Sequence, residues 1–265
     1  MPTIHPTAIV EAGAILADTV TVGPYAFVGK ATRLDAGVEV MQGAQICGNT
    51  TLEKDVKVHQ YAIIGTPPQD LGYQPEDDVS VVVGEASVIR EFVTINAGTK
   101  KGGGITRIGK KCFIMIYCHI GHDCQVGDGV IMANNATLAG HVEIGARTII
   151  GGLTPIHQFV RIGEGCMIVG ASAVSQDIPP FCLAEGNRAV VKGLNAVGLR
   201  RHCDKESIMA LKKAYRTLFR GDTPLKQSAT TLLETEENPY VHTMCQFIIQ
   251  TKRGIPYERV GNDEL

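Results

Sequence analysis

The chain has 265 residues, of which 44% are hydrophobic and only 5% aromatic, with 30 glycines and no tryptophan. This composition favours many tight turns and slim strands over a thick globular core. The formal net charge of -2 gives no reason to expect nucleic acid or an anionic membrane as a partner. We see no signal peptide at the N-terminus, and no apolar segment approaches the length of a membrane span.

The eight cysteines include no CxxC pair, which argues against a zinc ribbon and against a disulfide framework. Three of them, Cys112, Cys118 and Cys124, recur at intervals of six, which marks them as small residues that fill a repetitive core. Free cysteines in this number are typical of a reducing compartment, so we expect the protein in the cytoplasm.

From the N-terminus onwards, an apolar residue occupies every sixth position of most of the chain. The pattern forms one run of eleven positions, a second of three and a third of twelve. The positions are Ile4, Val10, Leu16, Val22, Val28, Leu34, Val40, Ile46, Leu52, Val58 and Ile64; then Val83, Ile89 and Ile95; then Ile108, Ile114, Ile120, Val126, Met132, Leu138, Ile144, Ile150, Ile156, Ile162, Ile168 and Val174.

A helix would space its apolar residues by three and four, and a flat strand would space them by two. A period of six instead predicts a triangular parallel β-helix, in which each hexad is one short strand plus a corner and three hexads complete a coil. Residues three hexads apart then stack about 4.8 Å from each other, as hydrogen-bonded strands do. We expect this mainly β domain over residues 1–190, with outward loops at about 65–82 and 97–105 where the pattern breaks.

A C-terminal helical domain is predicted over residues 191–265, because the apolar period there becomes helical. Asp204 is a plausible N-cap and Gly221 a plausible stop of its main helix. Seven Lys and Arg residues against two acids between Leu194 and Arg220 form a local basic face. This face indicates either an acidic or phosphate-bearing partner, or simply a solvated helix surface.

The coil of three hexads places polar side chains in columns on the outside of the prism. His122, Gly140 and Gln158 fall in one column, and Asp123 and His141 fall in the column beside it. His119 lies one corner earlier, and His157 directly precedes Gln158. Four of the eight histidines therefore gather on about three coils.

A surface imidazole beside a carboxylate that fixes its tautomer is suited to general-base catalysis near neutral pH. Gly140 leaves room for a carbonyl group to approach the backbone, where its N–H could stabilise an oxyanion. Because no serine or cysteine nucleophile is apparent in this column, we expect a substrate hydroxyl or amine, deprotonated by His122, to attack an acyl group directly. The alternative is a zinc site of outward histidines shared between the subunits of a trimer.

Three motifs make the chain resemble the UDP-N-acetylglucosamine acyltransferases, which open lipid A synthesis. They are His119-Ile120-Gly121-His122-Asp123-Cys124, Ala133-Asn134-Asn135-Ala136-Thr137-Leu138-Ala139-Gly140-His141 and Ile156-His157-Gln158-Phe159. Pro68-Gln69-Asp70-Leu71, Asp177-Ile178-Pro179-Pro180, Gly186-Asn187 and Gly198-Leu199-Arg200-Arg201 add to the match, which runs over essentially the whole chain.

This resemblance implies a left-handed β-helix and a homotrimer with active sites between subunits. It also implies that a 3-hydroxyacyl chain moves from acidic acyl carrier protein, which carries it on phosphopantetheine, to the 3-position of a UDP-amino sugar, with no further cofactor and no metal. By matched position, His122 would be the general base, Asp123 its partner and Gly140 the oxyanion donor. The substrate-binding residues would be Asp70, His119, His141, His157, Gln158, Gly170, Asn195 and Arg201, with Gly170 as the floor of a groove for a long acyl chain.

Two positions depart from the pattern common in that family. Gly72 stands where many members carry Lys, and Asn96-Ala97 replaces a frequent His-Arg pair. Both departures leave open whether the acceptor is a 3-hydroxyl or a 3-amine. O-acylation is therefore the leading hypothesis, and the alternatives are N-acylation of a UDP-3-amino sugar or a later glucosamine intermediate, a metal-dependent trimeric hydratase, and a non-catalytic scaffold.

Overall fold

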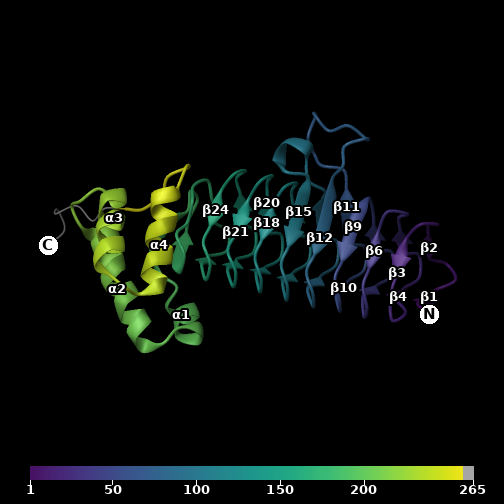
Figure 1. Cartoon of the computed structure of the whole chain (residues 1–265), viewed down its shortest axis with the longest axis horizontal. Helices are drawn as coiled ribbons and strands as arrows, with labels where there is room; N and C mark the ends of the chain where they lie inside the picture. The colour runs from purple at the N-terminus through teal and green to yellow at the C-terminus, as the bar shows by residue number, and fades with distance from the viewer. Residues whose placement is uncertain (259–265) are drawn as a thin grey trace.

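The computed structural model describes residues 1–258 and shows a long triangular prism that ends in a small group of helices (Figure 1). Three sheets of mostly parallel strands form the walls of the prism. Along most of it successive strands go to different sheets, so that each coil contributes one strand to each wall, whereas the last three strands all belong to one wall. The end of the domain predicted to reach residue 265 lies outside the described residues. Within the described residues, no helix has the length and apolar character needed to cross a bilayer.

The first wall ends in the only antiparallel pair of strands among the described residues, formed by its last two members. Its strands, in sheet order, are β1 (Thr3–Ile4), β4 (Thr21–Val22), β7 (Glu39–Val40), β10 (Lys57–Val58), β13 (Val88–Ile89), β16 (Phe113–Ile114), β19 (Ile131–Met132), β22 (Ile149–Ile150), β25 (Met167–Ile168), β26 (Cys182–Glu185) and β27 (Val190–Leu194).

The other two walls have eight strands each. The second contains β2 (Ile9–Val10), β5 (Phe27–Val28), β8 (Gln45–Ile46), β11 (Ile63–Thr66), β14 (Thr94–Asn96), β17 (His119–Ile120), β20 (Thr137–Leu138) and β23 (Pro155–Ile156). The third contains β3 (Ile15–Leu16), β6 (Arg33–Leu34), β9 (Asn49–Leu52), β12 (Ser80–Val83), β15 (Ile105–Ile108), β18 (Gln125–Val126), β21 (Glu143–Ile144) and β24 (Arg161–Ile162).

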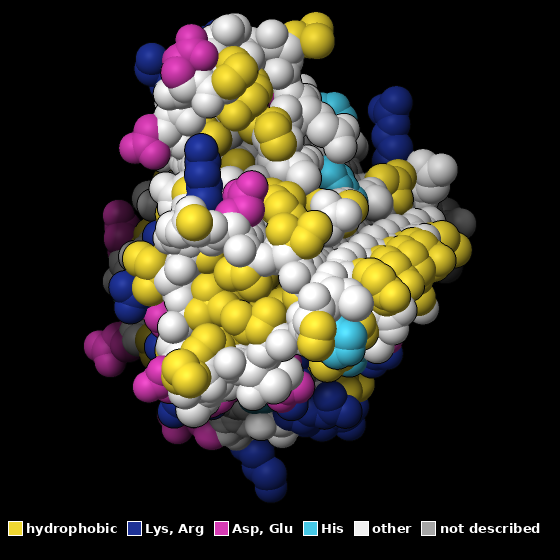
Figure 2. All heavy atoms as spheres, turned by 90° about the vertical axis from the view of Figure 1, so that its right-hand side faces the viewer, with side chains coloured by type: hydrophobic (Ala, Val, Ile, Leu, Met, Phe, Trp, Pro, Cys, Tyr) yellow, Lys and Arg dark blue, Asp and Glu magenta, His cyan; other side chains and the backbone are white. Residues whose placement is uncertain are grey.

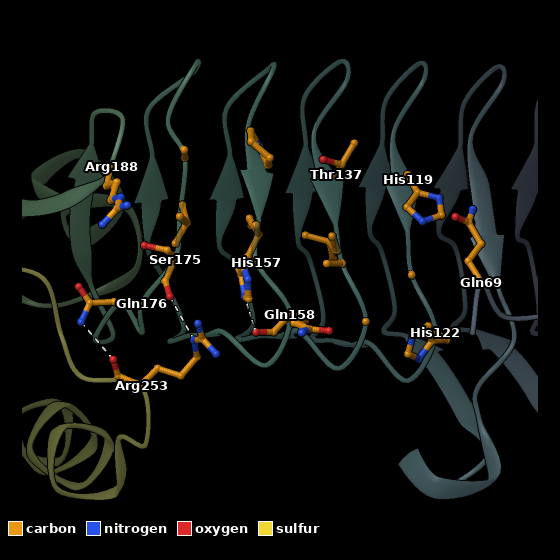
Figure 3. Close-up of a pocket in the computed structure, with 18 of the residues that line it drawn as sticks. Gln69, His119, His122, Thr137, His157, Gln158, Ser175, Gln176, Arg188 and Arg253 are labelled. Carbon is orange, nitrogen blue, oxygen red and sulfur yellow. Dashed lines mark hydrogen bonds between the residues drawn. The ribbon is translucent and has the colours of Figure 1, made fainter. Parts of the chain in front are cut away.

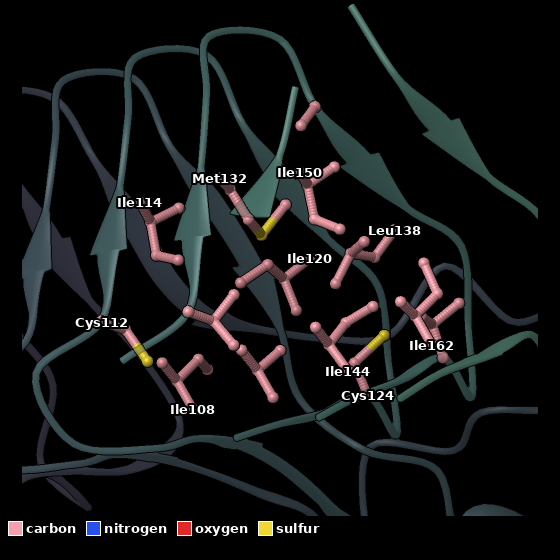
Figure 4. Packing of buried hydrophobic residues seen from close by; sticks show 14 of the residues in the cluster. Ile108, Cys112, Ile114, Ile120, Cys124, Met132, Leu138, Ile144, Ile150 and Ile162 are labelled. Carbon is pink, nitrogen blue, oxygen red and sulfur yellow. The ribbon is translucent and has the colours of Figure 1, made fainter. Parts of the chain in front are cut away.

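Nearly all the residues of the six-residue pattern point into the prism, as predicted. Ile114, Met132 and Ile150, for example, are fully buried and stack on one another along the first wall (Figure 4). The first coil is the exception, because no coil covers it and Ile4 remains 41% exposed. Figure 2 looks onto this N-terminal end of the molecule, where apolar side chains lie uncovered.

Paired strands keep a separation of three hexads except at the two loops and at the last parallel pair, where Met167 lies opposite Leu183. Ile64 pairs with Ile95 across the first loop, and Ile95 pairs with Ile120 across the second, so inward residues still stack on inward residues. The first loop is shorter than predicted, because β11 continues to Thr66 and β12 already begins at Ser80. The second contains a short 3-10 helix, η1 (Lys100–Gly102), and both loops project from one edge of the prism (Figure 1).

Four α-helices follow the last strand, and they cover the C-terminal end of the prism (Figure 1). They are α1 (Ala196–His202), α2 (Lys205–Arg220), α3 (Leu225–Thr235) and α4 (Pro239–Gln250). The predicted cap is confirmed, since the Asp204 carboxylate accepts a hydrogen bond from the Ser207 amide at 2.8 Å. Gly221 ends α2 as predicted, although its φ of -87° shows that no left-handed cap is needed there.

The stacked core makes a stability prediction. Replacing the fully buried Ile120 by alanine should lower the free energy of unfolding by about 2–5 kcal/mol, because the neighbouring coils cannot close the cavity. Ile9→Ala is the matched control, since that side chain is 62% exposed and should change stability by less than about 0.5 kcal/mol. Denaturant titration of both variants measures the difference, and equal losses would show that the prism interior is not the stabilising core.

Candidate active site

The predicted polar column lies at one corner of the prism, between the second and third walls. The amide of His141 donates to the carbonyl of His122 at 2.9 Å, and the amide of Phe159 donates to the carbonyl of Gly140 at 3.2 Å. These bonds between corners continue the strand ladder, so side chains on successive coils are held beside each other. The predicted neighbours in the two columns are therefore brought together as expected.

His122 and Asp123 form the centre of this corner. Nδ1 of His122 lies 2.8 Å from Oδ2 of Asp123, whose side chain is only 1% exposed. A carboxylate is an obligate acceptor when ionised, so Nδ1 carries the proton in this pair and Nε2 is left with a lone pair. The ring of His141 lies edge-on to the His122 ring, with 4.9 Å between the ring centroids, and stacks on the Phe159 ring with 4.4 Å between centroids. These rings cover one side of the His122 imidazole.

Gly140 lies directly against the imidazole of His122. A Cβ atom at this glycine would come within 2.5 Å of Nε2, so only a residue without a side chain fits. The Gly140 N–H donates to no acceptor within the described residues. An unpaired N–H beside the free nitrogen of a histidine is the arrangement that an acyl-transfer site requires.

A cleft of 1060 Å3 opens in front of this pair and runs along the second wall (Figure 3). His119, His122, Gly140, His157 and Gln158 line it, which brings five of the predicted site residues into one cavity. Burial, with a smaller contribution from the charge of His122, lowers the pKa of His119. His119 is therefore neutral at pH 7, and its Nδ1 shares a 2.8 Å hydrogen bond with the Thr94 hydroxyl.

The cysteines behind the corner are not nucleophiles. Burial raises the pKa of the Cys118 thiol to about 11 and that of the Cys124 thiol to about 12. Both sulfurs donate to backbone carbonyls, at 3.1 Å to Ala133 and 3.1 Å to Ala139. They remain thiols at neutral pH, which agrees with the prediction that the substrate itself supplies the attacking atom.

Two family models match parts of the chain. The bacterial transferase hexapeptide model, which describes six repeats, matches residues 105–140, where the His122 corner lies. The second domain of the UDP-N-acetylglucosamine O-acyltransferases matches residues 177–256.

Full-length relatives extend this match over the whole chain. A protein of Campylobacter concisus named acyl-[acyl-carrier-protein]--UDP-N-acetylglucosamine O-acyltransferase is 54% identical over 263 residues, which cover 99% of this chain and 100% of the relative. A relative of the same name from Campylobacter jejuni subsp. doylei is 56% identical over 264 residues, again 99% and 100% of the two chains. The chain belongs to this acyltransferase family.

Solved structures confirm the fold of this acyltransferase. UDP-N-acetylglucosamine acyltransferase from Campylobacter jejuni superposes with a TM-score of 0.93 at 54% identity, covering 97% of this chain and 100% of that one. The left-handed parallel β-helix with a helical C-terminal part, which the resemblance implied, is therefore confirmed. The names of the relatives also favour O-acyl transfer over the N-acylation and hydratase alternatives.

Four of the predicted site residues lie away from the His122 cleft within one copy of the chain. Asp70 lines a small hollow of 220 Å3 between the two loops, and Gly170 lines a shallow depression of 440 Å3 that shares Asn187 and Arg188 with the main cleft. Asn195 and Arg201 line a separate pocket of 270 Å3 between the first wall and α1.

The side chain of Asn195 already has structural partners. It caps α1 by accepting from the Gly198 amide at 3.0 Å, and it donates to the Gly165 carbonyl at 2.9 Å.

The cleft also contains residues that sequence reasoning did not assign to the site. Ser175 and Gln176 could have been found, because they continue the columns of His157 and Gln158 by one more coil. Arg188 and Arg253 carry no such signal, because they come from non-repeating segments near the C-terminus. The Arg253 guanidinium reaches the column by donating to the Ser175 carbonyl at 3.1 Å (Figure 3).

The two departures from the family pattern have local explanations. Asn96 lines the cleft, and its Nδ2 donates to Thr66 at the end of β11 at 2.9 Å and to Pro67 at the start of the first loop at 3.1 Å, so it fixes the beginning of this loop to the prism. At Gly72 a Cβ atom would lie 3.9 Å from Nζ of Lys101. The second loop therefore places the ammonium group of Lys101 close to position 72, where many family members carry a lysine.

Three residues of this corner could instead hold a metal ion. His122, Asp123 and His141 each offer one ligand atom, and the three atoms lie within 4.8 Å of one another. However, both oxygens of Asp123 already accept hydrogen bonds, from Thr99 and from His122, at 2.7–2.8 Å. Since Asp123 is already paired with Thr99 and His122 in this way, the donor set fits a hydrogen-bonded His-Asp pair better than a tetrahedral zinc site.

The contact between Gly140 and His122 makes a direct prediction. In Gly140→Ala the new methyl group should push the imidazole out of place and lower kcat by about 100-fold, since displacements of about 1 Å have effects of that size. Gly193→Ala is the control, because no atom lies within 4 Å of the added Cβ. Steady-state kinetics of both variants, with melting curves to confirm native folding, test this; an unchanged kcat in Gly140→Ala would contradict the placement of the ring.

Proposed function

We propose that this acyltransferase moves a 3-hydroxyacyl group from acyl carrier protein to the 3-hydroxyl of UDP-N-acetylglucosamine, with His122 as general base. The observation that carries the proposal is the buried Asp123 carboxylate on Nδ1 of His122, because it leaves Nε2 as a base facing the cleft. An imidazole in this state can take the hydroxyl proton near neutral pH. The names of the full-length relatives supply the donor and the acceptor.

The chemistry requires only these residues and the two substrates. As Nε2 of His122 removes the proton, the hydroxyl oxygen attacks the thioester carbonyl carbon, and the negative charge on the carbonyl oxygen is met by the Gly140 N–H. The C–S bond then breaks, and the thiolate of phosphopantetheine takes the proton from the imidazolium. The products are an ester and a free thiol, so no redox partner is needed. We propose no cofactor beyond the phosphopantetheine of the donor.

Substrate contacts are assigned by their place around this reaction centre. His119, His157 and Gln158 line the same cleft as His122 and are proposed to bind the sugar nucleotide and the acyl-phosphopantetheine arm, with His141 beside the base. Gly170, which has no side chain, is proposed to floor the groove for a long acyl chain.

Asp70, Asn195 and Arg201 are proposed to reach a His122 cleft in the assembled oligomer. Within one copy Asn195 and Arg201 line a different pocket, so a neighbouring copy would have to supply them. A homotrimer with sites between subunits, as the family resemblance implies, would satisfy this requirement.

Acyl carrier protein is acidic and would meet a basic surface on the helical domain. Lys212, Arg216 and Arg220 are exposed on α2, whereas Leu211 and Leu218 of the same helix are buried. Opposite charges on the two partners would speed their encounter and make it sensitive to salt. All eight cysteines are free, which supports a reducing compartment, and we propose the cytoplasm as the location.

The general-base assignment predicts the effect of removing the imidazole. His122→Ala should lower kcat by about 10²–10⁴-fold, because proton transfer by a positioned base contributes that much. The assay follows thiol release from a 3-hydroxyacyl carrier protein in the presence of UDP-N-acetylglucosamine. His5→Ala, at an exposed histidine on the first coil, should retain full turnover. If His122→Ala also turns over at the normal rate, another group is the base.

A shared active site can be tested by complementation. His122→Ala and Arg201→Ala should each be inactive as pure oligomers. Oligomers assembled from both variants should regain activity, because some clefts then combine an intact His122 with an intact Arg201 from a neighbour. The control is a mixture of the two proteins without reassembly, which should stay inactive. No recovery in reassembled oligomers would place Arg201 and His122 in the same subunit's site or remove Arg201 from it.

A further inference from the structure

The carboxylate of Asp123 is held by a residue that lies outside the repeat. Thr99, in the second loop, donates twice to it: its backbone amide bonds Oδ1 at 2.8 Å, and its hydroxyl bonds Oδ2 at 2.7 Å. Thr99 is itself 7% exposed, and the Asp123 side chain is almost fully buried. Each carboxylate oxygen accepts one of these two bonds, so together they fix the plane of the carboxylate.

The second loop is folded tightly around this contact. The Thr99 hydroxyl also accepts from the Gly102 amide at 3.1 Å, which starts the 3-10 helix η1. Gly102 packs on the carboxylate so closely that any Cβ atom there would overlap its carbon and both oxygens. Gly103 then turns the chain away with a φ of +101°, a conformation that glycine adopts easily. The loop therefore offers Asp123 two hydrogen-bond donors from Thr99 and the bare backbone of Gly102 to pack against.

Asp123 is constrained from the prism side as well. It occupies the left-handed corner position with a φ of +60°, and its amide donates to the Thr106 hydroxyl at 2.8 Å. With its backbone fixed in this way, the side chain can still rotate about its Cα–Cβ and Cβ–Cγ bonds. Thr99 removes that freedom, and Oδ2 is left pointing at Nδ1 of His122.

We propose that Thr99 is a positioning residue for acyl transfer, which holds the Asp123 carboxylate in the orientation that fixes the proton of His122 on Nδ1. The chain of contacts Thr99, Asp123, His122 then ends in a free Nε2 at the cleft. This inference rests on the proposed role of His122 as the base. Thr99 does not touch the reacting atoms, so its loss should slow the chemical step without weakening the binding of either substrate.

The test compares Thr99→Val with Thr99→Ser. Valine keeps the branched shape and the backbone donor but removes the hydroxyl, so kcat should fall about 10–100-fold while both KM values stay within about twofold. Serine restores the hydroxyl and should recover most of kcat. Thr32→Val is the matched control, because it removes another buried hydroxyl, which donates to the Gly29 carbonyl at 2.8 Å, far from the site; its kcat should be unchanged.

A double-mutant cycle with Asp123→Asn separates positioning from a general structural effect. Asparagine tolerates the left-handed conformation at this corner. If Thr99 acts through the carboxylate, Thr99→Val should lower kcat by less than about twofold in the Asp123→Asn background. A full additional loss in that background, or a normal kcat in Thr99→Val alone, would overturn the inference. Should Thr99→Val melt below the assay temperature, Thr99→Ala replaces it in the same cycle.

Failure of the proposed function would look different. Normal turnover in His122→Ala would remove the base assignment whatever the Thr99 variants show. A normal kcat in Thr99→Val together with an inactive His122→Ala would remove only the role of Thr99.

Discussion

The hydrogen bonds between coils are the constraint on which the rest of this structure depends. Each coil bonds to the next with inward residues opposite inward residues, so the prism repeats after every three hexads along most of its length. A shift by one residue would turn every buried apolar side chain outward. The same register places Gly140 next to His122 and His141 next to Asp123, and the active corner is therefore a product of the repeat that forms the core.

The two loops add chemistry without disturbing that register. Ile64, Ile95 and Ile120 stack in order although extra residues separate them in sequence. Because the prism is rigid on both sides of each insertion, a loop can hold a side chain in place over the corner. The second loop uses this to grip the Asp123 carboxylate, and the first is tied to the cleft through Asn96. A base on a flexible loop would lack this preorganisation, whereas His122 is fixed by its coil, by Asp123 and by the His141 ring.

Periodicity explains which features could be predicted from sequence. The prism, its inward residues, the positions of both loops and the columns of His122 and Asp123 all follow from counting hexads and grouping them in threes. Thr99 could not be found in this way, because the path of an inserted loop has no period, and Arg188 and Arg253 come from segments outside the repeat. The assignment of Asn195 and Arg201 came from family resemblance alone. One copy places them in another pocket, and only contacts between copies could bring them to His122.

The central claim is that this corner forms an ester at the 3-hydroxyl of the sugar. It is tested most directly by mass spectrometry of the product from UDP-N-acetylglucosamine and a series of 3-hydroxyacyl carrier proteins. We expect the mass of one 3-hydroxyacyl group to be added to the sugar nucleotide, and to be lost again in mild base because an ester hydrolyses there. An adduct that survives mild base, or thiol release without any acylated sugar nucleotide, would contradict the account.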